Sequence, residues 1–359
     1  MAALAAAICL AACAPKADKV TMLVGTYSSD NSDGIYVFDF DQENGTAGPV
    51  KGHASLRDAS FLALSADGTT VYAVSERPDS SAALAAYSFD SEGGDLNLLG
   101  MAVTQGEDPC YVASDGRIAV TANYSGGSLS VFRLAEDGAL LDSAPFQLIH
   151  GTLGGPDLGR QEVPHEHCAF FTPDGKDLVA SDFSADRLVT YEVAGDSLKE
   201  YSEIHLESDY GPRHILFRDG RTAYVIGELS GKITVMDYSE GILLPVQVID
   251  CDPVHARGSA DIKMTPDCRF LYASNRLEND GVTVFKVLQD GTLGQVGYTR
   301  TGPHPRNINV TPNGKFLLVA CRDSDSIEVY RIDPATGLLE DTHGKISVGR
   351  PVCIQFVGR

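Results

Sequence analysis

A repeated pattern constrains the fold of this chain more than any other feature of its sequence. The pattern is an apolar strand, a turn that usually contains Asp-Gly, a second strand, a polar break and a third strand. Its turn position recurs roughly every 45 to 60 residues, at Gly68, Gly116, Gly175, Gly220, Cys268 and Gly314. Units of this length with several strands are typical of a β-propeller, and no segment shows the sustained 3.6-residue period of a helix.

The strands that follow these turns predict the number of blades. Six of them can be aligned, namely TVYAVSE, IAVTANY, DLVASDF, TAYVIGE, FLYASNR and FLLVACR. A seventh, TMLVGTY at residues 21–27, has no such turn before it, and PVCIQFV at residues 351–357 is expected to supply its missing inner neighbour. The sequence therefore predicts an all-β fold, a seven-bladed β-propeller of four-stranded antiparallel blades. It forms a single domain over residues 20–359, and its N- and C-terminal strands close the ring.

Each blade is expected to bring the start of its first strand beside the end of its second, because the two strands run antiparallel. These corners lie on one face of the disc, near the central channel, and they collect His167, Arg213, Glu228, Arg276 and Arg306. Arginine forks bind carboxylate or phosphate, and a histidine or glutamate beside them can transfer a proton. The corners therefore predict a site for a small anionic substrate.

Two other interpretations of charged corner residues are open. Glu228 and Arg276 occupy equivalent corners of adjacent blades and could instead form a structural ion pair between those blades. Glu76 and Arg322 lie at corners away from the others, and we interpret them as charges on the rim.

Two histidines, His165 and His167, stand directly before an apolar strand. In a regular strand their side chains would point the same way. A metal site would need a third ligand, and none is obvious nearby, so structural or substrate-contacting roles are favoured over metal ligation. The preceding insertion, roughly residues 146–164, lacks the GxxxxGK[ST] pattern of a phosphate loop. We call the opening of the central channel on the face of these corners the funnel. We expect the insertion to fold over the funnel and to bring Arg160 and Gln161 to the ligand.

Composition and the amino terminus limit the partners of the chain. The formal net charge is −21 without any cluster of basic residues, which argues against nucleic-acid binding. Residues 1–19 read as a lipoprotein-like signal peptide with a short tether, in which Cys13 of Leu-Ala-Ala-Cys would be lipidated. We therefore expect a monomer at a bacterial cell envelope, held to the membrane only through that lipid; the alternative is a cytoplasmic protein. The other six cysteines are expected to be buried thiols, with one or two disulfides possible after export.

Motifs spread from about residue 20 to the end resemble one known family. They are ANYSGGSLSVF, GRQEVPHEHCAFFTPDG, GPRHILF, LYASNR, GPHPRNINVTPNGKFLLVA and PVCIQFV. Together they are similar to the seven-bladed lactonase family, which includes propeller-type 6-phosphogluconolactonases and a carboxymuconate-lactonizing enzyme. The resemblance implies that the catalytic positions are His167, Glu228, Arg213 and Arg276. The residues expected to bind the substrate are His165, Arg160, Gln161, Asn123, Tyr124, Asn275 and Arg306.

The resemblance also implies a reaction, which is hydrolysis of a sugar δ-lactone without a metal or other cofactor. The expected substrate is 6-phospho-D-glucono-1,5-lactone, which would give 6-phosphogluconate as in the pentose phosphate pathway. Glu228 or His167 would activate water, and Arg276 or Arg213 would stabilise the oxyanion. That lactone belongs to the cytosol, whereas the amino terminus points to the envelope. Two alternatives are a non-catalytic envelope-anchored propeller that binds carbohydrate or protein, and a muconate-type cycloisomerase.

Overall fold

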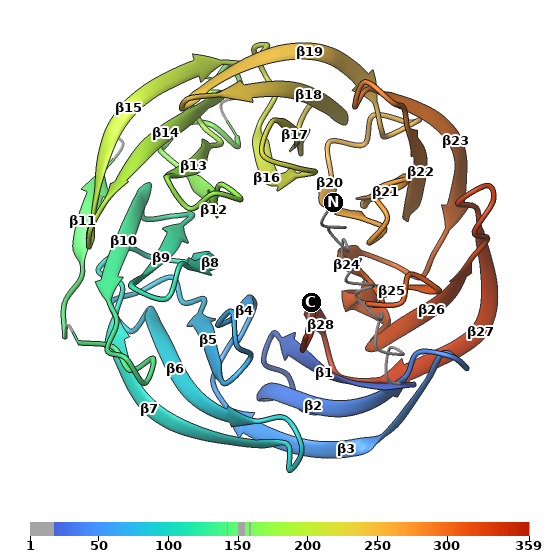
Figure 1. The fold of residues 1–359 in the computed structure, drawn as a ribbon, viewed down its shortest axis with the longest axis horizontal. Helices are drawn as coiled ribbons and strands as arrows, with labels where there is room; N and C mark the ends of the chain where they lie inside the picture. Colours follow the sequence, from blue (N-terminus) through green and yellow to red (C-terminus); the bar gives the residue numbers. More distant parts are fainter. Residues whose placement is uncertain (1–17, 142, 150–154, 158, 359) are drawn as a thin grey trace, which may run out of the picture.

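The computed structural model describes residues 18–141, 143–149, 155–157 and 159–358, so the predicted leader up to residue 17, with Cys13, lies outside the described residues. Seven antiparallel sheets of four strands stand around a central axis (Figure 1). Within each sheet the strands are ordered from the centre to the outer wall. The predicted seven-bladed β-propeller is confirmed.

The strands of each blade, from the innermost outwards, are as follows. The first three blades contain β28 (Pro351–Phe356), β1 (Lys19–Thr26), β2 (Gly34–Asp41) and β3 (Thr46–Ser55); β4 (Leu62–Leu64), β5 (Thr70–Ser75), β6 (Ala83–Asp90) and β7 (Asp95–Val103); and β8 (Pro109–Ser114), β9 (Ile118–Asn123), β10 (Ser128–Arg133) and β11 (Phe146–Ile149). The fourth and fifth contain β12 (Glu166–Phe171), β13 (Asp177–Asp182), β14 (Arg187–Ala194) and β15 (Ser197–His205); and β16 (Pro212–Phe217), β17 (Thr222–Gly227), β18 (Lys232–Ser239) and β19 (Ile242–Asp250). The last two contain β20 (Ser259–Met264), β21 (Phe270–Asn275), β22 (Gly281–Val287) and β23 (Leu293–Arg300); and β24 (Pro305–Val310), β25 (Phe316–Cys321), β26 (Ser326–Ile332) and β27 (Leu339–Ser347).

The two ends of the chain close the ring in the first blade. β28 pairs antiparallel with β1, with Met22 opposite Phe356 and Val24 opposite Ile354. The last blade in sequence is hydrogen-bonded to β28, because Nδ2 of Asn309 in β24 donates to the carbonyl of Ile354 at 2.8 Å. β28 thereby covers the inner edge of β1, which would otherwise be open to non-native pairing.

The core lies between neighbouring blades. The second strands β5, β9, β21 and β25 are buried along their whole length, because both of their faces are covered by adjacent sheets. Between the first and last blades, the ring of Phe40 packs 6.4 Å from Phe316 and 6.0 Å from Phe356, measured between centroids. Burying one such side chain stabilises the fold by about 1.5–3 kcal/mol.

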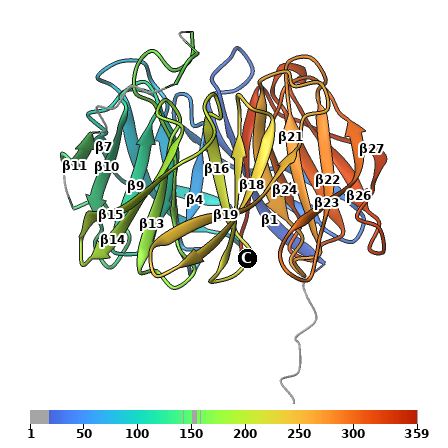
Figure 2. The same ribbon diagram turned by 90° about the horizontal axis from the view of Figure 1, so that it is seen from above.

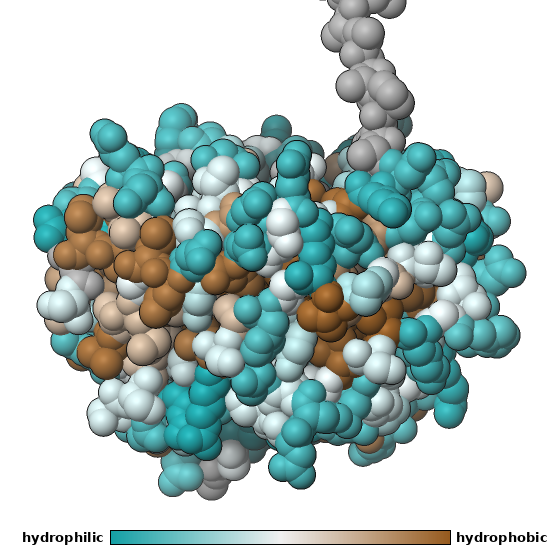
Figure 3. Space-filling view, turned by 90° about the horizontal axis from the view of Figure 1, so that it is seen from below, coloured by the Kyte–Doolittle hydropathy of each residue, from teal (hydrophilic) through white to brown (hydrophobic). Residues whose placement is uncertain are grey.

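The outer wall is less apolar but is not uniformly polar. Apolar side chains appear in groups on one side of it (Figure 3), and β7 exposes Leu98, Met101 and Val103. Outermost strands have unpaired backbone edges, and Pro49 in β3 and Pro245 in β19 limit pairing there because proline has no N–H.

The only helical element of the described residues is a short 3-10 helix, Arg322–Ser324. Accordingly, no described helix is long and apolar enough to cross a membrane. All six cysteines of the described residues are free thiols, so the disulfides considered possible are not formed.

Candidate active site

The residues that follow the second strands gather at one face of the disc. In six blades the backbone N–H of this corner residue donates to the carbonyl just before the innermost strand, as from Glu228 to Gly211 at 2.8 Å. β28 starts at such a corner and ends at the lower face in Figure 2, so the corners lie at the upper face. The corner residues are Tyr27, Glu76, Tyr124, Phe183, Glu228, Arg276 and Arg322.

A β-bulge interrupts the start of the innermost strand in several blades. In β8, β12, β16 and β24 the register shifts after the first residue, so that the second residue has no partner in the ladder. The bulged residues are Cys110, His167, Arg213 and Arg306. A bulge re-aims a side chain out of the regular alternation and is frequent beside active sites. Three residues predicted for the site therefore share one backbone feature.

Glu228 lies between three arginines. Its Oε2 accepts a hydrogen bond from Nε of Arg213 at 2.8 Å and lies 3.0 Å from Nη2 of Arg276. Its Oε1 accepts from Nη2 of Arg160 at 2.6 Å. Burial by itself would raise the pKa of this carboxyl, but the charges of Arg276, Arg213 and Arg160 hold it far below its usual range. Glu228 is therefore ionised, and its contact with Arg276 is part of a larger ionic cluster.

The two buried arginines of this cluster are also fixed by main-chain carbonyls. Nη1 of Arg213 donates to the carbonyl of Ala260 at 2.6 Å and lies 3.1 Å from Nε2 of His214. Nε of Arg276 donates to the carbonyl of Gly258 at 2.8 Å. Burial lowers the pKa of Arg276 to about 9, with the adjacent carboxylate opposing the shift, so this guanidinium is still cationic at neutral pH. Both cations are held rigidly.

His167 is a buried, neutral imidazole next to the cluster. Its ring centroid lies 5.7 Å from that of Tyr124 and 5.4 Å from that of His214, and Nδ1 is 3.7 Å from Sγ of Cys110. Burial, followed by the charge of Arg213, holds the pKa of His167 well below its ordinary value. No described residue forms a hydrogen bond with Nε2. This nitrogen can accept a proton from a molecule in the funnel.

His165 has a different environment from His167. It stacks on Tyr124 with 3.9 Å between ring centroids, and its Nδ1 lies 2.8 Å from the carbonyl oxygen of Tyr124. The regular alternation assumed for the two histidines does not apply, because His165 precedes β12 and His167 is bulged. Among the described residues, no three His, Cys, Asp or Glu side chains are grouped so that they could hold a metal.

The described part of the insertion reaches the site through Arg160. Besides its bond to Glu228, Nη2 of Arg160 lies 3.4 Å from Oη of Tyr124. A second ion pair anchors the same segment, because Oδ2 of Asp157 accepts from Nη2 of Arg257 at 2.6 Å. The insertion therefore supplies one charged side chain to the cluster, while the contact of Arg160 with a ligand stays a prediction.

Three residues expected to contact the substrate are instead hydrogen-bonded within the fold. Asn123 and Asn275 end the second strands of their blades, where the amide of each bonds to hydroxyls within its own blade. Nε2 of Gln161 donates to the carbonyl of Phe183 at 3.0 Å and to Oδ1 of Asp186 at 2.7 Å. All three are buried and support the strands and the insertion; their contact with the substrate stays a prediction.

Glu76 is not a rim charge, contrary to the interpretation from sequence. Its side chain is only 15% exposed, Oε1 accepts from Oη of Tyr27 at 2.7 Å, and Oε2 lies 3.8 Å from Nη2 of Arg306. Arg322 does lie nearer to solvent and pairs with Asp323 at 2.6 Å. The reason for the difference is that the blades of Glu76 and Arg306 flank the first blade on either side, so that two residues far apart in the chain lie close together.

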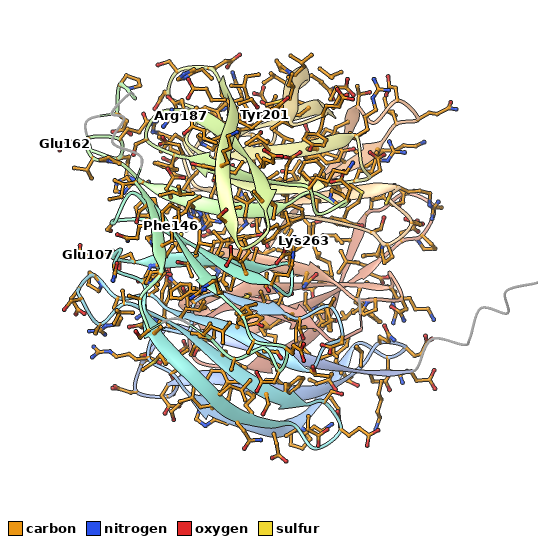
Figure 4. The ribbon with its side chains drawn as sticks, turned by 60° about the vertical axis from the view of Figure 1, so that its left-hand side comes forward. Glu107, Phe146, Glu162, Arg187, Tyr201 and Lys263 are labelled. Carbon is orange, nitrogen blue, oxygen red and sulfur yellow. The ribbon has the colours of Figure 1, made fainter. Side chains whose placement is uncertain are left out.

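Beneath the site lies a polar network that the sequence reasoning missed. Nδ1 of His214 is 2.8 Å from Oδ1 of Asp261, which also binds Nζ of Lys263 at 2.9 Å. Figure 4 shows Lys263 in the interior of the ring, whereas Glu107 and Glu162 lie in loops at one end of the molecule. Burial lowers the pKa of His214 to about 4. The signal for this network was a histidine and an aspartate at buried positions of two inner strands.

Comparisons with known proteins agree with the architecture. The family model described as "Lactonase, 7-bladed beta-propeller" matches residues 21–356. The chain belongs to this lactonase family. A 6-phosphogluconolactonase of Bacillus subtilis is 34% identical over 345 residues, which are 93% of this chain and 97% of that protein.

Two solved structures from bacteria have the same fold. The crystal structure of a "putative 6-phosphogluconolactonase" from Bacteroides uniformis is 51% identical, with a TM-score of 0.92, and the match covers 95% of this chain and 100% of that chain. The periplasmic gluconolactonase PpgL of Pseudomonas aeruginosa is 30% identical with a TM-score of 0.89, over 95% and 99% of the two chains.

Proposed function

We propose that this lactonase-family protein hydrolyses a sugar δ-lactone and that its preferred substrate is 6-phospho-D-glucono-1,5-lactone. The observation that carries the proposal is a neutral imidazole, His167, beside a fixed cluster of arginines at the mouth of the propeller. The names of the relatives in Bacillus subtilis and Bacteroides uniformis support a phosphorylated lactone.

His167 is the better candidate for the base. With a proton on Nδ1, which faces the sulfur of Cys110, the lone pair of Nε2 is available to water. Nε2 takes a proton as the water oxygen bonds to the ring carbonyl carbon, and the carbonyl oxygen becomes an oxyanion. When the tetrahedral intermediate collapses, the bond between the carbonyl carbon and the ring oxygen breaks. The imidazolium then returns its proton to that oxygen, which leaves a hydroxy acid.

Glu228 and the arginines then have electrostatic roles. A carboxylate with three arginine partners is a weak base, so we assign Glu228 to holding Arg213 and Arg276 in place. Either guanidinium can stabilise the oxyanion, because both are fixed before the substrate arrives and need no reorganisation. Water and a lactone then suffice for the reaction, without a covalent enzyme intermediate.

The location of the protein bears on the substrate. We propose export to the cell envelope through the lipoprotein-like leader, and the periplasmic relative in Pseudomonas aeruginosa supports this. That relative is called a gluconolactonase, so unphosphorylated glucono-1,5-lactone is the second candidate substrate.

A direct assay of both lactones tests the proposal. Hydrolysis by the full chain is measured with and without EDTA, and the spontaneous rate of hydrolysis is subtracted. The protein should hydrolyse at least one of the two lactones, and EDTA should not change the rate. Exchanging the base, His167→Asn, should lower turnover about 100-fold or more, whereas His343→Asn, at an exposed position, should not change it. Activity on neither lactone would favour a binding function. Activity abolished by EDTA would support metal ligation by His165 and His167.

A further inference from the structure

Arg306 differs from the other arginines of the site because its guanidinium makes no hydrogen bond to any described residue. The other three are each in contact with Glu228. The carboxylate within ion-pair distance of Arg306 is that of Glu76, and 3.8 Å is too long for a hydrogen bond. A guanidinium has five N–H donors, and none of the nitrogens of Arg306 is sealed from solvent without a partner. These donors are therefore available to a small molecule in the funnel.

Tyr27 brings a second arginine to the same place. The guanidinium carbons of Arg306 and Arg350 lie 5.2 Å and 5.6 Å from the centroid of its ring. Stacking on an aromatic ring fixes the plane of a guanidinium without using its donors. Within the described part of the chain, no carboxylate lies within ion-pair distance of the guanidinium of Arg350, although the backbone N–H of Arg350 donates to Oδ1 of Asp325 at 2.8 Å.

The carboxyl of Glu76 forms no hydrogen bond with either of these cations. Its Oε1 accepts a hydrogen bond from Oη of Tyr27, while Oε2 is buried and has no hydrogen-bond partner among the described residues. Burial raises the pKa of Glu76, with the charge of Arg306 opposing.

The site thus divides its positive charge between two ends. At one end Glu228 pairs with three arginines beside the proposed base. At the other, the guanidinium groups of Arg306 and Arg350 remain for a charge that the substrate brings, and a phosphate accepts bidentate hydrogen bonds from such groups. We propose that Tyr27, Arg306 and Arg350 form the subsite for the phosphate of the lactone, and that Arg306 determines the preference for a phosphorylated substrate. This inference rests on the proposed lactone hydrolysis.

The test combines a change in the enzyme with a change in the substrate. The kcat/KM of the full chain and of Arg306→Gln is measured for 6-phosphogluconolactone and for glucono-1,5-lactone. The substitution should lower kcat/KM for the phosphorylated lactone about 10- to 100-fold, mainly through KM, and change the value for the other less than about threefold. Arg322→Gln removes an equal charge from the same face but from an arginine paired with Asp323, and should affect neither substrate selectively.

Binding of the products separates this inference from the proposed function. Calorimetric titration with 6-phosphogluconate and with gluconate should show that the wild type binds the phosphorylated acid more tightly and that Arg306→Gln loses this difference. An equal loss of kcat/KM on both lactones, no loss on either, or unchanged product binding would overturn the subsite. A wild type inactive on both lactones would overturn the proposed function, while Arg306-dependent binding of 6-phosphogluconate would still support the subsite.

Discussion

Glu228 shows how surroundings set the role of a single residue. An isolated glutamate in this funnel would be a candidate base, yet contacts with three arginines lower its pKa and occupy both of its oxygens. The surroundings of His167 have the opposite effect, because burial keeps its imidazole neutral and Nε2 has no hydrogen-bond partner among the described residues. The division of work between the two follows from their partners and not from their residue types.

We expect Glu228→Gln to reduce turnover by about two orders of magnitude or more while the protein still folds. The amide keeps the shape of the side chain but removes the charge that fixes Arg213 and Arg276. Steady-state kinetics and circular dichroism test this, with Glu200→Gln on the exposed face of β15 as the control. Turnover close to that of the wild type would exclude Glu228 from the catalytic machinery.

At the scale of strands, the bulges at the inner ends of β8, β12, β16 and β24 build the site. One extra residue in the inner strand turns its side chain away from the ladder. The same device, repeated around the ring, presents a thiol, an imidazole and two guanidinium groups. Blades that are alike in backbone thus contribute different chemistry.

The strand β28 has a separate task, which is closure of the ring. We expect a chain that ends at Arg350 to lose its cooperative thermal transition or to aggregate, because β1 would expose its inner edge and Asn309 would lose its partner. Removing only Gly358 and Arg359 leaves β28 complete and should not change the melting temperature. A truncated chain that melts like the full one would contradict this role.

For the molecule as a whole, buried histidines make the folded state sensitive to acid. Burial is the main cause that lowers the pKa of His214 to about 4 and of His304 to about 3, and it lowers that of His167 as well. Below their ordinary pKa of about 6.5 the unfolded chain binds protons that the folded protein does not, so stability falls as the pH falls.

We therefore expect the free energy of unfolding to decrease by a few kcal/mol, an order-of-magnitude figure from about 1.4 kcal/mol per pKa unit, between pH 6.5 and pH 4. The lowered pKa of Glu228 extends this loss below pH 4.5, whereas the raised pKa of Glu76 acts in the opposite sense. Urea denaturation at several pH values measures how the free energy of unfolding depends on pH. His304→Gln should flatten the profile and His343→Gln should not; a flat profile in the wild type would be contradictory.

The sequence by itself determined the number of blades, the closing strand and the face on which the corner residues meet. It could do so because strand alternation, turn residues and antiparallel pairing are local properties that repeat along the chain. It also identified His167, Arg213, Glu228 and Arg276 as residues that meet at that face, partly through resemblance to a family.

Only the tertiary structure decided what these residues are able to do. The bulge at His167 and the internal bonds of Asn123 and Asn275 depend on how the strands of one blade pair with each other. The contact between Glu76 and Arg306 depends on segments far apart in the chain. Burial and neighbouring charge then set which groups are protonated, and neither can be read from a linear pattern, since both depend on which residues of different blades lie close together.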